Sequence, residues 1–205
     1  MKWFLQLYSF SNKRACIFVG TFAVLILLLS LFPNIFNQYL SYDRHAISAF
    51  EWWRFLSANF VHLNFNHGLM NMAALILIFV MFPEIRMKLW LFLVFLASFS
   101  VTLGIWIFDP TVVNYVGFSG VIYGMWVFGA ILTLRSQAWL SVAVIMLIVG
   151  AVIQQQSNSF DITYLRAWIG GNVIVNSHLY GLICGVFFAF AVHIKSYVSA
   201  YFKPE

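Results

Sequence analysis

Apolar residues gather in six runs separated by short polar breaks. The runs are Cys16–Phe32, His67–Phe82, Leu89–Phe108, Gly117–Leu134, Trp139–Ile153 and Val173–Ile194. About 17 to 25 apolar residues cross the roughly 30 Å hydrocarbon core of a bilayer, so each run is a candidate span, the second and fifth being short. Because backbone amides in lipid must pair within their own segment, each run predicts a transmembrane helix. Prolines just past the first three runs favour helix ends there.

Composition supports a membrane domain. The chain is 63% hydrophobic and 8% charged, whereas a soluble domain carries roughly 25% charged residues. The length leaves no room for a second soluble domain once the spans are removed. We therefore expect one all-α domain over residues 1–205, a polytopic membrane protein with a bundle of six transmembrane helices in the lipid bilayer. The net charge of +5 does not indicate a nucleic-acid partner, because basic residues stand at most two in a row.

The distribution of lysine and arginine predicts the orientation. With six spans, eight basic residues fall on one side and three on the other. The first group is Lys2, Lys13, Arg14, Arg86, Lys88, Arg135, Lys195 and Lys203, and the second is Arg44, Arg54 and Arg166. The side richer in lysine and arginine is the cytoplasmic one. Both termini are therefore expected in the cytoplasm, with the loop 33–66 outside.

Polar side chains collect at the start of the second, fourth and sixth runs, which all cross the membrane in the same direction. The second run opens with His67 and Asn71, four residues apart and so on one helical face. The fourth opens with Gly117, Phe118, Ser119 and Gly120, followed by Tyr123, and the sixth with Asn176, Ser177 and His178. Ionisable or strongly polar residues inside a span are costly and are functional candidates by default. These groups are predicted to lie close together near the outer surface of the membrane.

A serine and a histidine at the same depth suggest nucleophilic catalysis. Serine needs a base to take its proton, and imidazole suits that task near neutral pH. Gly181 and Gly185 form a small-residue face that would let the sixth span approach the fourth. His67, the Asn71 amide and the Ser119 backbone N–H are candidate donors to an oxyanion. No Asp or Glu lies within any run, so a Ser119–His178 dyad is the predicted arrangement.

Each of these residues also has an explanation that involves no catalysis. A serine in a membrane helix often bonds to a carbonyl one turn earlier, and a lone histidine can cap a helix end at the headgroups. His62, His67 and His178 could instead bind a metal ion, but they lack a nearby carboxylate or accessible cysteine. No metal or cofactor is therefore expected. The tryptophan-rich segment 50–60 is either an aromatic belt or a short helix in the outer leaflet.

Taken together, these motifs resemble the rhomboid intramembrane proteases. The resemblance rests on Glu51-Trp52-Trp53-Arg54, on His62, His67 and Asn71 in H-x4-H-x3-N spacing, on G-F-S-G with Tyr123, and on His178-x2-Gly-x3-Gly. It implies that Ser119 is the nucleophile, His178 the base, and His67 and Asn71 the oxyanion donors. It also implies that Tyr123 packs on His178 and that Gly117 gives close backbone approach. The loop Gln154–Asn172 would then be a mobile cap over the site.

Within that family the segment 51–67 is most similar to the bacterial rhombosortase branch. That branch acts on membrane-anchored secreted proteins with a Gly-rich motif, a hydrophobic span and a basic end at their C-terminus. A bacterial inner membrane, with the active site towards the periplasm, is then expected. Phe118 departs from the smaller aliphatic residue frequent in relatives and is expected to alter the pocket beside the nucleophile. The alternatives are a general rhomboid that cleaves type I single-span proteins and a non-catalytic six-helix protein, either a transporter or a chaperone-like one.

Overall fold

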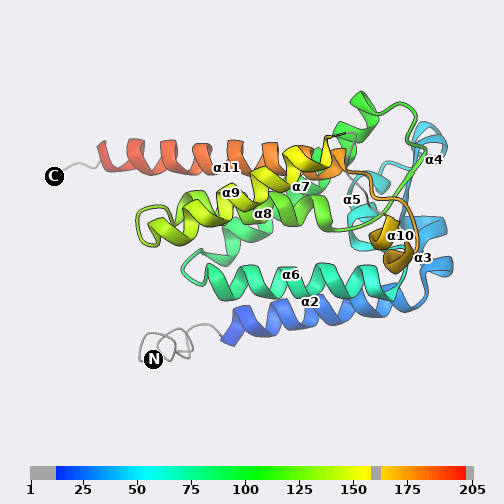
Figure 1. The fold of residues 1–205 in the computed structure, drawn as a ribbon, viewed down its shortest axis with the longest axis horizontal. Helices are drawn as coiled ribbons and strands as arrows, with labels where there is room; N and C mark the ends of the chain where they lie inside the picture. Colours follow the sequence, from blue (N-terminus) through cyan, green and yellow to red (C-terminus); the bar gives the residue numbers. More distant parts are fainter. Residues whose placement is uncertain (1–12, 158–162, 202–205) are drawn as a thin grey trace.

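A computed structural model describes residues 13–157 and 163–201, and within them every predicted apolar run forms a helix (Figure 1). These helices are α2 (Lys13–Leu31), α6 (Phe65–Met81), α7 (Met87–Phe108), α8 (Ser119–Leu132), α9 (Ala138–Gln155) and α11 (Asn176–Tyr201). The predicted all-α bundle is confirmed. Two starts were predicted too early: α8 begins two residues after Gly117, and α11 begins three residues after Val173.

The shorter elements gather at one end of the bundle, on the right in Figure 1. They are the helices α3 (Pro33–Leu40), α4 (Arg44–Ser48), α5 (Arg54–Ser57) and α10 (Thr163–Ile169), a 3-10 helix (Ala58–Phe60), and the strands β1 (Tyr42–Asp43) and β2 (Asn114–Tyr115). The two strands pair antiparallel, with Tyr42 opposite Tyr115. The segment 50–60 is therefore helical in part, and Phe50, Trp52 and Trp53 expose their rings, which suits contact with a bilayer interface.

Length and hydropathy identify the membrane-crossing helices of the described residues. Three helices are long and apolar enough to span alone, namely α7, α9 and residues Asn176–Ile194 of α11. The number rises to as many as five if each of two bent pairs counts as one span, α2 with α3 at 103° and Arg54–Phe60 with α6 at 90°. The remaining apolar helix, α8, has 14 residues and is buried on most of its surface. A helix that is apolar all round belongs in a core, and α8 packs against α6, α7, α9 and α11.

Glycines bring α8 and α11 into backbone contact. A Cβ added to Gly120 would lie 2.7 Å from the carbonyl oxygen of Ser177, and one added to Gly124 would lie 2.6 Å from that of Gly181. In the opposite direction, Cβ atoms on Gly181 and Gly185 would collide with the carbonyl oxygens of Gly120 and Gly124. The expected small-residue face is thus present on both helices. It allows the closest possible approach of two membrane helices.

Arg54 holds the short helices in place. Its side chain is buried, and Nε donates to Glu51 Oε2 at 2.7 Å. The two terminal nitrogens donate to the carbonyl oxygens of Ser41 and Gln38, each at 2.8 Å. A buried guanidinium is tolerated when its donors are satisfied in this way. The hydrogen bonds join α3, the following loop and α5 into one layer beside the start of α6.

The α8–α11 contact gives the first prediction. Gly181→Ala should lower the free energy of unfolding by about 1–3 kcal/mol, because the added methyl group must push the two helices apart. Gly150→Ala on α9 is the matched control, since a Cβ there meets no atom within 4 Å. Thermal unfolding in detergent measures both. Equal stability of Gly181→Ala and the wild type would show that the contact is not tight.

Candidate active site

Ser119 and His178 meet at the start of two adjacent helices. Ser119 is the first residue of α8 and His178 the third of α11, and His178 Nε2 lies 2.9 Å from Ser119 Oγ in a hydrogen bond. The His178 side chain is buried. One turn along α8, the Tyr123 ring stacks on the imidazole, with centroids 4.2 Å apart and planes 6° from parallel. The structure therefore brings all three of these predicted residues together.

Gln155, the last residue of α9, is a neighbour that the sequence analysis missed. Its Oε1 lies 2.7 Å from His178 Nδ1, and its Nε2 donates to the Tyr123 hydroxyl at 2.8 Å. The fifth apolar run ends at Ile153, and Gln155 stands between two other glutamines with nothing to distinguish it. The depth of Gln155 in the membrane, rather than its residue type, indicates that it lies near Ser119. Because α9 runs opposite to α8, its end lies level with the start of α8.

The first turns of α11 are anchored to the residue that follows α7. Asn176 Nδ2 donates to Asp109 Oδ1 at 2.6 Å, and the Tyr180 hydroxyl donates to Asp109 Oδ2 at 2.8 Å. Asp109 directly follows α7. Asn176, one of the polar residues at the start of the sixth run, is therefore engaged with Asp109. This pair of bonds fixes the turn of α11 that carries His178.

His67 and Asn71 lie on α6, whose first turn is capped by Asn64. The Asn64 side chain accepts a hydrogen bond from the His67 backbone N–H at 2.9 Å. His67 and Ser119 line the same cavity, and within the described part of the chain His67 Nδ1 has no hydrogen-bond partner. Asn71 Nδ2 donates to the His67 carbonyl oxygen at 3.0 Å. The structure thus places His67 in the same cavity as Ser119, and Asn71 one turn farther along α6.

Gly117 lets the backbone pass against the His67 ring. Its φ of +122° lies in the region that favours glycine, and an added Cβ would be 2.7 Å from His67 Cε1. The Gly117 N–H donates to the Ala58 carbonyl at 3.1 Å, and its own carbonyl accepts from the Tyr115 hydroxyl at 2.7 Å. Both of its polar backbone groups are therefore held in place two residues before Ser119.

His62 supports the same stretch of backbone. It lies between the 3-10 helix and α6, is fully buried, and its Nε2 accepts the Phe118 backbone N–H at 3.4 Å. The ring therefore stays neutral, which an accepting nitrogen requires. Among the described residues no three His, Cys, Asp or Glu side chains group closely enough to hold a metal ion.

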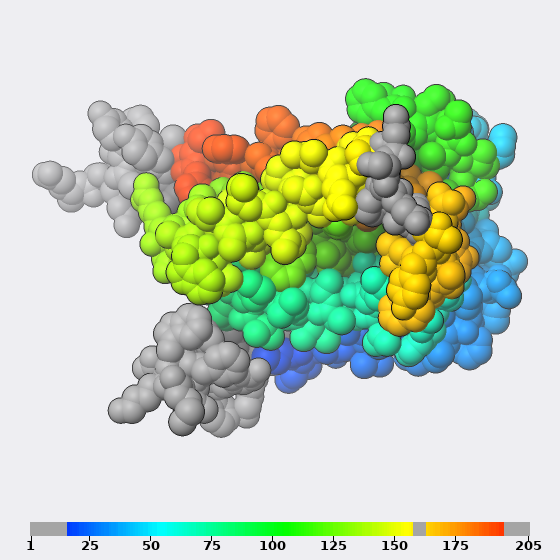
Figure 2. Space-filling view, viewed as in Figure 1, coloured from blue at the N-terminus to red at the C-terminus, as the bar shows by residue number. Residues whose placement is uncertain are grey.

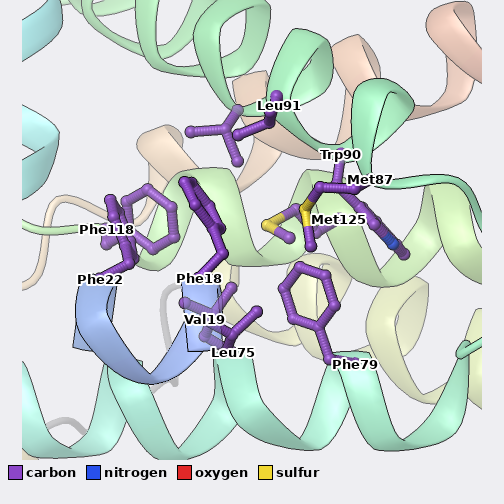
Figure 3. Close-up of a pocket in the computed structure, with 11 residues that line it drawn as sticks. Phe18, Val19, Phe22, Leu75, Phe79, Met87, Trp90, Leu91, Phe118 and Met125 are labelled. Atoms are coloured by element: carbon purple, nitrogen blue, oxygen red, sulfur yellow. The ribbon is translucent and has the colours of Figure 1, made fainter. Parts of the chain in front are cut away.

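The Phe118 ring points away from the cavity beside Ser119. It packs on Phe22 and Phe60, with centroid distances of 5.7 and 5.8 Å. It lines a separate apolar pocket between α2, α6, α7 and α8, together with Leu75 and Met125 (Figure 3). The expectation that Phe118 alters the pocket beside the nucleophile is therefore wrong. Because α8 begins at Ser119, the side chains of Phe118 and Ser119 point to different sides, Phe118 into the apolar pocket and Ser119 into the cavity that His67 lines.

The cavity beside Ser119 is covered in part by the segment before α11. Its wall includes Val116 after β2, Ile169 at the end of α10, and Val173 and Ile174. Figure 2 shows α10 over the start of α6, where Asn64 and Asn66 each donate to the Trp168 carbonyl oxygen, at 3.1 and 3.3 Å. The predicted cap Gln154–Asn172 thus contains a docked helix, and residues 158–162 of it lie outside the described residues.

A family model, the rhomboid domain, matches residues 49–195. The chain belongs to the rhomboid family. Ser119, His178 and their neighbours all lie within the matched part of this rhomboid protein, and the match supports intramembrane serine protease activity in general. A search of curated proteins found no match. The helices and the family together make the chain a multi-pass membrane protein whose substrates are embedded in the membrane.

The contact between Gly117 and His67 gives the second prediction. Gly117→Ala should lower turnover roughly 10- to 10³-fold, the range for losing a donor to the transition state, because the methyl group displaces the His67 ring. Gly20→Ala on α2 is the control, since no atom lies within 4 Å of its added Cβ. Cleavage of a transmembrane substrate in detergent is the assay. Wild-type turnover of Gly117→Ala would mean that the position of His67 does not affect the reaction.

Proposed function

We propose that this rhomboid protein is an intramembrane serine endopeptidase in which Ser119 is the nucleophile and His178 the general base. The observation that carries the proposal is the 2.9 Å hydrogen bond between His178 Nε2 and Ser119 Oγ at the start of two membrane helices. Two residues from different helices, 59 positions apart, form the contact that nucleophilic catalysis needs. A transporter or a chaperone-like relative has no need of this pairing.

The proposed reaction follows from this geometry. Ser119 Oγ attacks the carbonyl carbon of the scissile peptide bond while His178 Nε2 takes the serine proton. The C–N bond then breaks, and the leaving amine receives that proton from His178. Water, again deprotonated by His178, releases the acyl group from Ser119. The cavity beside Ser119 carries both polar and apolar side chains, which suits an extended peptide and the water that hydrolysis consumes.

The developing oxyanion needs donors, and we assign this role to His67, Asn71 and the Ser119 backbone N–H. His67 shares the cavity with Ser119. A primary amide has two N–H groups, so Asn71 keeps one after bonding to the His67 carbonyl. Tyr123 would hold the imidazole plane through the observed stacking. Gly117 would leave room for the substrate and for the His67 ring.

The substrate class is proposed from the likeness of segment 51–67 to the rhombosortase branch. We assign to this protein the Gly-rich C-terminal sorting tails of secreted proteins, cleaved at the outer face of a bacterial inner membrane. Both termini would be cytoplasmic, as the excess of lysine and arginine on that side supports. The chain would act as a single membrane domain over residues 1–205, with the segment Gln154–Asn172 as its cap.

The third prediction tests the nucleophile and the base. Ser119→Ala and His178→Ala should each lower cleavage roughly 10³-fold or more, and the double variant should be no worse, because the two groups act as one unit. Cleavage in liposomes and labelling by a fluorophosphonate probe measure the effect, with denatured protein as the labelling control. Near wild-type cleavage by Ser119→Ala would exclude Ser119 as the nucleophile.

The fourth prediction concerns the position of the cut. At about 1.5 Å rise per residue, Ser119 and His178 lie within roughly 5 Å of the start of their helices, so the scissile bond should lie at the outer end of the substrate's span. A Gly-rich tail should be cut faster than the same tail with leucine in place of glycine, because glycine unwinds more readily. Mass spectrometry of the products locates the cut. A cut at the bilayer centre or the cytoplasmic end would contradict the proposed orientation.

A further inference from the structure

The two nitrogens of the His178 ring have different partners. Nε2 meets Ser119 Oγ at 2.9 Å, and Nδ1 meets Gln155 Oε1 at 2.7 Å. Because a carbonyl oxygen only accepts, Nδ1 must carry the proton in this arrangement. The lone pair of Nε2 then faces the serine hydroxyl. This tautomer is the one that can take the serine proton, so the Gln155 oxygen selects the reactive form of the ring.

Tyr123 contacts both His178 and Gln155. Its aromatic face stacks on His178, and its hydroxyl accepts a hydrogen bond from Gln155 Nε2 at 2.8 Å. The Gln155 amide is therefore held at both ends, by His178 through its oxygen and by Tyr123 through its nitrogen. The opposite rotation of the amide would place an NH₂ group against Nδ1. Nε2 would then have to carry the proton, and His178 could not act as a base.

We propose that Gln155 is a positioning residue that holds His178 as the Nδ1–H tautomer and fixes the plane of its ring, an inference that rests on the proposed function. Gln155 acts through His178 and lies apart from the cavity that Ser119 lines. During attack the serine proton moves to Nε2, while the Nδ1 proton stays in its bond to Gln155 Oε1. The amide oxygen then faces an imidazolium, and a hydrogen bond to a charged group is stronger than one to a neutral group.

The character of the site favours an amide in this role. The group that faces His178 Nδ1 is the neutral amide of Gln155, at the end of a membrane helix. A carboxylate at this depth would carry a desolvation cost that an amide avoids. Gln155 reaches His178 from a third helix, since α9 packs against α8 on one side of the site. Its position at the end of α9 lets the long side chain reach back toward the first turn of α11.

The experiment compares two substitutions at one position. Gln155→Leu removes the acceptor, and we expect kcat to fall roughly 10- to 100-fold with KM within about twofold, because a bond to a group that becomes charged is lost. Gln155→Glu keeps an oxygen that can accept from Nδ1 and should recover most of that loss. Gln137→Leu, at the opposite end of α9 where the side chain makes no capping hydrogen bond, is the matched control and should cleave like the wild type.

A second measurement reads the tautomer directly. In the full-length protein labelled with ¹⁵N-histidine, solid-state NMR distinguishes Nδ1–H from Nε2–H, and comparison with His178→Ala assigns the signal. We expect Nδ1–H in the wild type and a loss of that preference in Gln155→Leu. The wild-type signal depends neither on cleavage nor on the variant, so an Nε2–H tautomer there overturns the proposal even if Gln155→Leu folds poorly.

The two proposals fail in different ways. Wild-type kcat in Gln155→Leu, an effect confined to KM, or an Nε2–H tautomer in the wild type would overturn the role of Gln155 while Ser119→Ala remains inactive. Equal loss in Gln155→Leu and Gln155→Glu would also overturn it, because packing and not the acceptor would then matter. Cleavage by Ser119→Ala at the wild-type rate would instead overturn the proposed function.

Discussion

The Ser119–His178 pair depends on the close contact between the backbones of α8 and α11. Gly120 and Gly124 on one helix face Gly181 and Gly185 on the other, and any Cβ at these positions would meet backbone. Without side chains between them, the helices lie close enough for a serine and a histidine at their first turns to share a 2.9 Å hydrogen bond. Larger residues would widen the gap by more than a hydrogen bond tolerates.

Other helices bring further polar groups to the end of the bundle where Ser119 and His178 lie. The start of α6 supplies His67, and the end of α9 supplies Gln155. Arg54 holds the short helices beside α6, and Asp109 holds the first turn of α11. The Arg54 side chain bonds to backbone carbonyl oxygens and to Glu51, and the Asp109 carboxylate accepts from Asn176 and Tyr180. Rigid placement of this kind keeps a reactive pair aligned before substrate arrives.

The sequence predicts the helices and most of the site because both depend on short-range patterns. An apolar run predicts a membrane helix by its length, and Ser119, His178, His67, Asn71, Gly117 and Tyr123 stand out as polar or small residues at run ends. The direction of a side chain depends on where its helix begins, which hydropathy does not give. Phe118 therefore packs on Phe22 of α2, which was not expected. The contact of Gln155 with His178 was not predicted either, because two similar glutamines flank Gln155 in the sequence.

The network around His178, the proposed base, differs from that of a catalytic histidine in a soluble protein. In a soluble triad a carboxylate orients the histidine and stabilises the imidazolium as it forms. Here the contact at Nδ1 is an amide oxygen, and Tyr123 both stacks on the ring and bonds to the amide. An amide stabilises the imidazolium less than a carboxylate does, but it introduces no charge that lipid or a partly wetted cavity would have to accommodate. The amide therefore orients the ring without adding a charge, which suits the proposed role of His178 as a base at the first turn of a membrane helix.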